Sequence, residues 1–244
     1  AGAAALGTSA SALGAAAAAA PAAAPAHTAD SQAATYLFFR ADEARFIEAA
    51  TERLIPPDAN GPGALQAGVP NYIDRQLAGA WGAGERLYRS GPWHPGLPGQ
   101  GYQLPFTPAE LFRNAVRGVA EDLKTRHNTT FDKLSGDAQD SYLQSLQTGQ
   151  QSLNGVPAHT FFESLLGLSI EGYFSDPIYG GNKDMAAWRM IGFPGAYASF
   201  YDLVDQHGIA FTRPPISIGE TARGVIHLHP VKEPTASGAR QGGK

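Results

Sequence analysis

Histidine is the side chain of this sequence that most directly suggests metal chemistry, because its ring nitrogens ligate transition metals. The seven histidines are His27, His94, His127, His159, His207, His227 and His229. Only His227 and His229 lie close together, where a short strand would place both on one face as two ligands. No third ligand accompanies them, so we predict no metal site and interpret these histidines as solvated or facing a partner. His94, between Trp93 and Pro95, could be a pocket ligand, but loop packing is the better interpretation.

Two glutamates and one serine are further candidates for catalysis. Glu163 and Glu171 lie eight residues apart on an expected helix, about two turns, so their carboxylates could share a face as an acid–base pair. Carboxylates in such positions more often lie on a helix surface or pair with arginine. Ser169 lies in GLSIEG, which is one residue longer than the nucleophile elbow G-x-S-x-G, and we interpret it as a packing residue. We therefore predict no catalytic residue.

Cofactor fingerprints and a basic footprint are both missing from the sequence. Gly82-x-Gly84 lacks the third glycine of a dinucleotide motif, and no phosphate-binding G-x-x-x-x-G-K-[ST] pattern occurs. The chain has no cysteine, which excludes thiolate nucleophiles, cysteine-held iron–sulfur clusters and c-type haem attachment. The formal net charge of −4 gives no sign of a nucleic-acid partner. We predict that the chain itself holds no cofactor and binds no nucleic acid.

Helical periodicity dominates the chain, so the expected fold is all-α. We expect a single helical domain over residues 30–230, with long ordered loops rich in Gly, Pro and aromatic residues and with flexible termini. Thr107-Pro108-Ala109-Glu110 has the residues of a capping box and predicts a helix start there. The other expected helices are 42–55, 71–88, 137–148, 157–172 and 196–206, the long loops are 56–70 and 90–106, and 224–229 could form a short strand.

Alanine dominates residues 1–26. This run ends in a small-residue stretch near Pro25 and Ala26, as does the apolar part of an export signal. The alternative is an alanine-rich linker. We assign residues 1–29 to an export-signal remnant or flexible leader. Residues 231–244 are polar and rich in Gly and Pro, which predicts a flexible tail.

Residues 171–195 combine glycines with aromatic side chains more densely than any other part of the chain. Glycine permits close backbone approach and positive φ, while aromatic rings supply area for burial or for an interface. Asp176-Pro177 predicts a turn. The composition indicates a rigid, shaped loop, and it leaves open whether that loop lines the core or contacts a partner.

This segment also carries a family resemblance. EGYFSDPIYGGNKDMAAWRMIGFPGA (171–196) resembles the signature of gluconate 2-dehydrogenase subunit 3, the small or gamma subunit of membrane-bound FAD-dependent dehydrogenases. FFRADEARFIEAATERLIPPDANGPGALQAGVPNYIDRQL (38–77) is similar to an earlier block of that family. The resemblance spans about residues 36–216, and the leader agrees with the family's twin-arginine signal, although no arginine pair is present.

The resemblance implies a periplasmic heterotrimer attached to the cytoplasmic membrane through its partners. In such a complex a large flavoprotein subunit of the glucose–methanol–choline type oxidises D-gluconate to 2-dehydro-D-gluconate, or oxidises a related sugar. Electrons pass from FAD, in some relatives through an iron–sulfur cluster, to the haems of a c-type cytochrome subunit and then to ubiquinone. The small subunit is non-catalytic: it supports folding and assembly of the flavoprotein, and its signal carries that partner across the membrane.

From this we expect the 172–195 segment and the 56–70 loop to touch the flavoprotein. The alternatives are a stand-alone enzyme using carboxylates with His94 or His159, and a sugar-binding module built on the aromatic loop. The expected interface residues are Tyr173, Phe174, Asp176, Tyr179, Gly181, Asn182, Trp188, Phe193 and Pro194.

Overall fold

The computed structural model describes residues 36–197, 203, 205–209 and 212–219. These residues belong to one compact unit of the chain. The expected leader (1–29), the strand at 224–229, the tail (231–244) and the histidines His27, His227 and His229 lie outside the described residues. No helix of the described ranges is long and apolar enough to cross a membrane.

Helices make up most of the described structure, so the expected helical fold is confirmed. The short 3₁₀ turns are Pro98–Gln100, Phe131–Lys133, Pro177–Tyr179 and Lys183–Met185. The helices and strands are α1 (Ala41–Leu54), α2 (Val69–Ala78), α3 (Pro108–His127), α4 (Gly136–Thr148), β1 (Ser152–Leu153), β2 (Val156–Pro157), α5 (Ala158–Phe174) and α6 (Ala186–Ile191).

Local sequence chemistry sets several of the helix ends. At the start of α3, Thr107 Oγ1 accepts a hydrogen bond from the Glu110 N–H, and the Glu110 carboxylate accepts one from the Thr107 N–H. This is the capping box that the sequence predicts, and Pro108 occupies the first turn. Ser135 caps α4 in a similar way, and α4 ends at Thr148 before Gly149, as expected.

Helix α2 is shorter than predicted. We expected a helix over 71–88, but α2 begins at Val69 and ends at Ala78, and turns follow it. The reason lies in the glycines after it. A Cβ on Gly82 would lie 2.0 Å from the Leu77 carbonyl oxygen, so the chain turns back onto the end of the helix where only glycine fits.

A two-stranded hairpin before α5 was not predicted. β1 and β2 pair antiparallel through a turn at Asn154-Gly155, whose φ angles of 50° and 88° suit asparagine and glycine. The hairpin packs tightly on α3, since a Cβ on Gly118 would lie 2.7 Å from the Leu153 Cα. Asn-Gly was the available sequence signal, but strands of two residues leave no periodic pattern.

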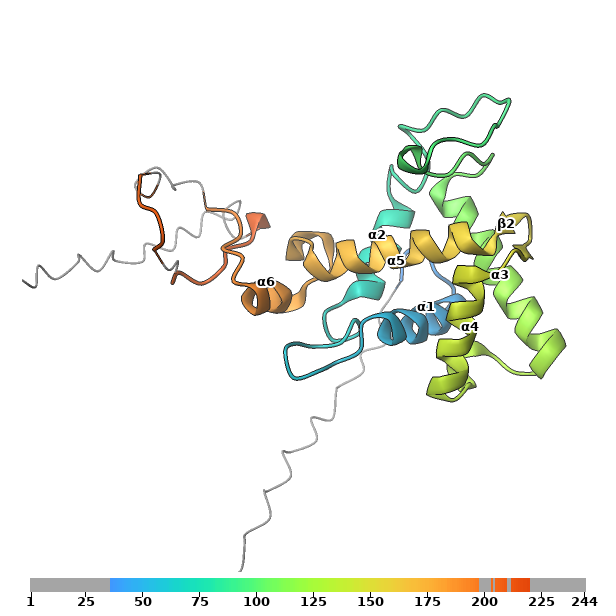
Figure 1. Cartoon of the computed structure of the whole chain (residues 1–244), viewed down its shortest axis with the longest axis horizontal. Coiled ribbons are helices and arrows are strands. Elements are labelled where there is room, and N and C mark those ends of the chain that lie inside the picture. Colours follow the sequence, from blue (N-terminus) through green and yellow to red (C-terminus); the bar gives the residue numbers. More distant parts are fainter. Residues whose placement is uncertain (1–35, 198–202, 204, 210–211, 220–244) are drawn as a thin grey trace, which may run out of the picture. The chain divides into compact units, whose positions relative to one another are not determined.

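Helix α5 is the central element, as its apolar circumference predicts. It packs against α1, α2, α3 and α4, and Figure 1 shows it running past these helices toward α6. Phe161 and Leu165 are fully buried. The Phe161 ring packs edge-on against Phe112 at 5.3 Å and beside Phe46 at 6.1 Å, which joins α1, α3 and α5 in one core.

The predicted helix over 196–206 does not begin where expected. Ala196 and Tyr197 are not helical, because the chain there forms a bridge instead: Ala196 N–H donates to the Ile216 carbonyl at 2.7 Å. Residues 198–202 and 204 lie outside the described residues.

Candidate partner interface

The segment after α5 is held by a buried asparagine. Asn182 is fully buried in a left-handed conformation, with φ 44°. Its side-chain N–H donates to the Ser175 carbonyl at 2.9 Å, and its Oδ1 accepts from the Ala187 N–H at 2.9 Å. One amide therefore joins the end of α5 to the start of α6, and both of its ends are satisfied away from water.

The backbone of this segment is unusually constrained. Asn182, Asp184 and Met185 all have positive φ, and they are three of the five such non-glycine residues in the described structure. Gly180, at φ 100°, and Gly181 allow close approach: a Cβ on Gly181 would lie 2.1 Å from the Gly172 carbonyl oxygen. Left-handed non-glycine residues persist only where their surroundings hold them. The turn is therefore a fixed shape.

Two of the five aromatic residues expected at a partner interface are buried inside the chain. Trp188 is 5% exposed, and its indole N–H donates to the Phe174 carbonyl at 2.8 Å. The Tyr173 hydroxyl donates to the Pro62 carbonyl at 2.7 Å. Their rings pack edge-on against Phe193 and Phe174, at 5.0 and 5.2 Å. These rings therefore hold the exposed ones in place.

The 56–70 loop contacts this segment directly. Besides the Tyr173–Pro62 bond, Lys183 N–H donates to the Ala67 carbonyl at 2.9 Å. Gly68 is required here, because it has φ 79° and a Cβ would lie 2.9 Å from the Gly180 carbonyl oxygen. The structure thus brings together the two regions that we expected to touch a partner.

A carboxylate attaches a later part of the chain to the same turn. Asp176 is buried and accepts from the Ile178 N–H, from the Ser217 hydroxyl at 2.6 Å and from the Ile218 N–H at 2.8 Å. The bridge between Gly195 and Ile216 adds a second attachment. Residues 216–218 therefore lie beside 176–178, which the sequence alone did not indicate.

Large apolar side chains project from this framework. More than half of the exposed large hydrophobic residues in the described structure lie between 174 and 218. We call seven of them the exposed apolar set. They are Phe174, Ile178, Tyr179, Met190, Ile191, Phe193 and Ile218.

The expected interface residues therefore divide into two groups. Phe174, Tyr179 and Phe193 are exposed, and Pro194 is half-buried. Sequence reasoning did not place four other exposed residues at the interface: Ile178, Met190, Ile191 and Ile218. The first three lie among the glycines of the 171–195 segment, and this position was a usable signal. The members that lie inside the chain are Tyr173, Asp176, Gly181, Asn182 and Trp188.

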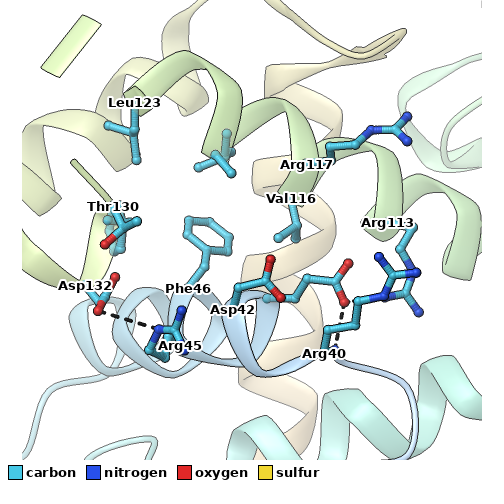
Figure 2. A pocket seen from close by; sticks show the side chains of 14 residues that line it. Arg40, Asp42, Arg45, Phe46, Arg113, Val116, Arg117, Leu123, Thr130 and Asp132 are labelled. Atoms are coloured by element: carbon cyan, nitrogen blue, oxygen red, sulfur yellow. Dashed lines mark hydrogen bonds and ion pairs between the residues drawn. The ribbon is translucent and has the colours of Figure 1, made fainter. Parts of the chain in front are cut away.

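A pocket of about 390 Å³ lies between α1, α3 and residues 130–132. Its floor is apolar and includes Phe46, Val116 and Leu123 (Figure 2). Arg113 bonds to Glu43, donates to the Phe38 carbonyl at 2.9 Å and lies 4.1 Å from the centre of the Phe38 ring. This arginine is therefore fixed at the pocket's edge.

Charges of both signs line the rim of this α1–α3 pocket. Figure 2 shows Arg45 and Asp132 on one side of Phe46, with Arg40 and Arg113 on the other. Arg45 and Asp132 approach to 3.9 Å. The lining includes no histidine, cysteine, serine or lysine, and Glu43 and Asp132 are both paired with arginine. The rim therefore places guanidinium and carboxylate groups above an apolar floor.

The candidates for chemistry are dispersed. His94, His127, His159 and His207 are exposed, and no group of three metal-ligating side chains occurs among the described residues. Ser169 is buried and its hydroxyl donates to the Leu165 carbonyl within α5, so it is a packing residue as predicted.

Glu163 and Glu171 are both exposed on α5, about 12 Å apart along its axis. That separation is too large for the acid–base pair considered from the sequence.

Comparison with known proteins agrees with the residues that carry the resemblance. Neither the curated proteins nor the solved structures gave a match. A protein-family model described as gluconate 2-dehydrogenase subunit 3 matches residues 41–195, from the start of α1 to the glycine that bridges to Ile216. The match covers the helices α1 to α6 and both strands of the hairpin, and the chain therefore belongs to the gluconate 2-dehydrogenase subunit 3 family.

Proposed function

We propose that this chain is the non-catalytic small subunit of a periplasmic, membrane-associated dehydrogenase complex of the gluconate 2-dehydrogenase type. Its partners would be an FAD-dependent flavoprotein, with an iron–sulfur cluster in some forms, and a c-type cytochrome. The complex would oxidise D-gluconate to 2-dehydro-D-gluconate and pass the electrons to ubiquinone. Family membership is the first support for this proposal.

The observation that carries the docking role is an exposed apolar set on a preformed framework. An interface gains affinity when its contact residues are already ordered, because less conformational entropy is lost on binding. Here Asn182, Asp176 and Trp188 are each buried and hydrogen-bonded to backbone groups that position the exposed residues. Aromatic and aliphatic residues in such a setting are typical interface anchors.

Support for assembly and export is the cellular part of the proposal. The alanine-rich residues 1–26 have the composition of an export signal, and a partner bound to the folded small subunit would cross the membrane with it. Fractionation of cells should place both subunits in the periplasm, and removal of residues 1–29 should leave both in the cytoplasm. Periplasmic flavoprotein without the leader would contradict this part.

Co-purification tests the docking role. The full chain is expressed with the proposed flavoprotein partner, and flavin absorbance reports the recovered complex. Ile178→Asp and Ile191→Asp each place a charge on an exposed apolar position, 47% and 56% exposed respectively, so folding should survive. We expect at least a tenfold loss of recovered flavoprotein.

Leu97→Asp is the matched control, because Leu97 is 71% exposed and lies in a different loop. Full recovery with both isoleucine variants would refute the assigned surface. Loss with Leu97→Asp alone would move the interface to the 90–106 loop.

A further inference from the structure

A second, smaller cavity lies where α5 passes the start of α3. Its volume is about 170 Å³, and its apolar floor includes Leu111, Phe112 and Leu168. We call it the Trp81 cavity. The cavity is also lined by Trp81, Tyr102, Ser164, Gly167 and Glu171.

Gly167 keeps this cavity open without a packing reason inside the chain. It lies in the interior of α5, where glycine is less favourable than alanine. A Cβ at Gly167 would meet no atom within 4 Å, whereas a Cβ on Gly172 of the same helix would lie 2.8 Å from the Tyr72 ring. Packing thus requires Gly172, whereas the space above Gly167 is open.

Glu171 puts an unpaired negative charge at the cavity. It lies in the last turn of α5, where the helix dipole disfavours a carboxylate. Among the described residues no cation forms an ion pair with it, although it accepts a hydrogen bond from the Tyr72 hydroxyl at 3.4 Å. No arginine, lysine or histidine lines the cavity.

Aromatic rings form another part of the wall of the Trp81 cavity. Trp81 is 45% exposed although it lines the cavity, and Tyr102 lies with it. A tryptophan face attracts cations through its ring quadrupole, more strongly than tyrosine or phenylalanine. An indole and an unpaired carboxylate therefore favour the same kind of occupant.

The hydroxyl groups that line the cavity do not favour a sugar as its ligand. The Tyr102 hydroxyl donates to the Phe106 carbonyl, and the Ser164 hydroxyl donates to the Thr160 carbonyl. Both donors are used inside the chain, while a sugar needs several donors and acceptors to replace its water. A sugar acid would in addition be repelled by Glu171.

We infer that the Trp81 cavity receives one basic side chain, an arginine or lysine, from the flavoprotein partner. The ammonium or guanidinium group pairs with the Glu171 carboxylate and lies against the Trp81 indole, and the aliphatic part of the side chain covers Gly167. The identity of the partner rests on the proposed function, but the preference for a cation does not.

The first test uses the isolated full chain and a small probe. N-acetyl-arginine amide, N-acetyl-citrulline amide and D-glucose are titrated while the NMR signals of the Trp81 indole N–H and the Gly167 amide are followed. We expect saturable shifts with the arginine probe and none with neutral citrulline. Glu171→Gln and Gly167→Leu should abolish the shifts, and Glu163→Gln, an exposed carboxylate of the same helix, should not. Shifts with glucose, or equal shifts with citrulline, would overturn the inference.

The second test asks whether the cation belongs to the partner. In the co-purified complex, Glu171→Gln and Gly167→Leu should lower flavoprotein recovery at least tenfold, with Glu163→Gln unchanged. Because nothing meets a Cβ at position 167, Gly167→Ala should raise the Tm of the isolated chain, which shows that the position tolerates a side chain. Arginine-dependent shifts with unchanged complex recovery would overturn the partner assignment. If the wild-type chain bound no flavoprotein, the proposed function would fail while the probe result still stood.

Discussion

Replacement of Asn182 tests whether the exposed apolar set depends on the framework beneath it. This side chain contacts no solvent and belongs to no surface, so its variants alter only the support. Asn182→Gly removes both side-chain hydrogen bonds but fits the left-handed φ of 44° without strain. Asn182→Ala removes the same bonds and adds strain at that φ. Asn182→Asp keeps the bond from the Ala187 N–H but puts an acceptor against the Ser175 carbonyl.

The expected magnitudes follow from these contacts. Loss of the amide leaves the Ser175 carbonyl and the Ala187 N–H buried without a partner, at about 1–3 kcal/mol each. Asn182→Gly should therefore lower the free energy of unfolding by about 2–6 kcal/mol, and Asn182→Ala by about 1 kcal/mol more. At about 2–4 °C per kcal/mol for a chain of this size, the Tm of Asn182→Gly should fall by roughly 4–24 °C.

The stability of the Asn182→Asp variant should also depend on pH. A buried carboxyl facing a carbonyl is favoured in its protonated form, so its pKa in the folded chain lies above the value of about 3.9 in the unfolded chain. The folded state then binds the proton more tightly, and the variant should be closest to wild type below about pH 4. Its destabilisation should grow as the pH rises through the unfolded pKa to the folded one.

Thermal unfolding of the full chain between pH 4 and 8, with hydrogen exchange at the Ala187 amide, measures these effects. All three variants should also lower recovery of the flavoprotein at neutral pH, though they change no exposed residue. If Asn182→Gly and Asn182→Ala unfolded like wild type, or if complex recovery stayed full while the Ala187 amide exchanged freely, the framework argument would be wrong.

Three other tests use independent substitutions. Gly181→Ala should lower the free energy of unfolding by several kcal/mol, since its Cβ would lie 2.1 Å from the Gly172 carbonyl oxygen. Gly99→Ala should leave the free energy of unfolding unchanged, because nothing lies within 4 Å of a Cβ there. Chemical denaturation compares the two variants. Thr107→Ala should cost about 1 kcal/mol by removing the cap of α3, again read from denaturation. Burial and the Glu171 carboxylate raise the pKa of Tyr72 to about 12, above about 10 in an unfolded chain, so stability should fall as the pH rises from 10 to 12, and less so in Tyr72→Phe.

The helices with strong periodicity or caps were predictable from the sequence. α1, α4 and α5 lie close to their expected ranges and α3 begins where its capping box predicts, because each depends on local signals such as the Thr107–Glu110 box or Gly149. α2 was misjudged at its C-terminal end. Apolar spacing continued through Trp81, but the chain reversed onto the Leu77 carbonyl, and that reversal depends on packing that periodicity does not report.

The candidate interface was predictable as a segment but not residue by residue. Composition marked 171–195 as a shaped loop, yet it could not say which rings turn inward. Trp188 is buried because its indole N–H finds the Phe174 carbonyl, 14 residues earlier in the chain. Asp176 was expected at an interface, but it binds Ser217 and Ile218, 41 and 42 residues away. Such long-range bonds leave no periodic trace in the sequence.

Substitutions in this region should therefore separate into two classes with different readouts. Buried polar residues such as Asn182 and Asp176 satisfy backbone groups, so their loss reduces both stability and docking. Exposed apolar residues such as Ile178 and Ile191 contribute little to folding, so their loss reduces docking alone. Three left-handed non-glycine residues lie between 182 and 185, and each disfavours folding locally, so the buried hydrogen bonds of Asn182 are needed to hold this turn. If the framework argument is right, loss of one of these bonds should therefore reduce docking even where every exposed residue is unchanged.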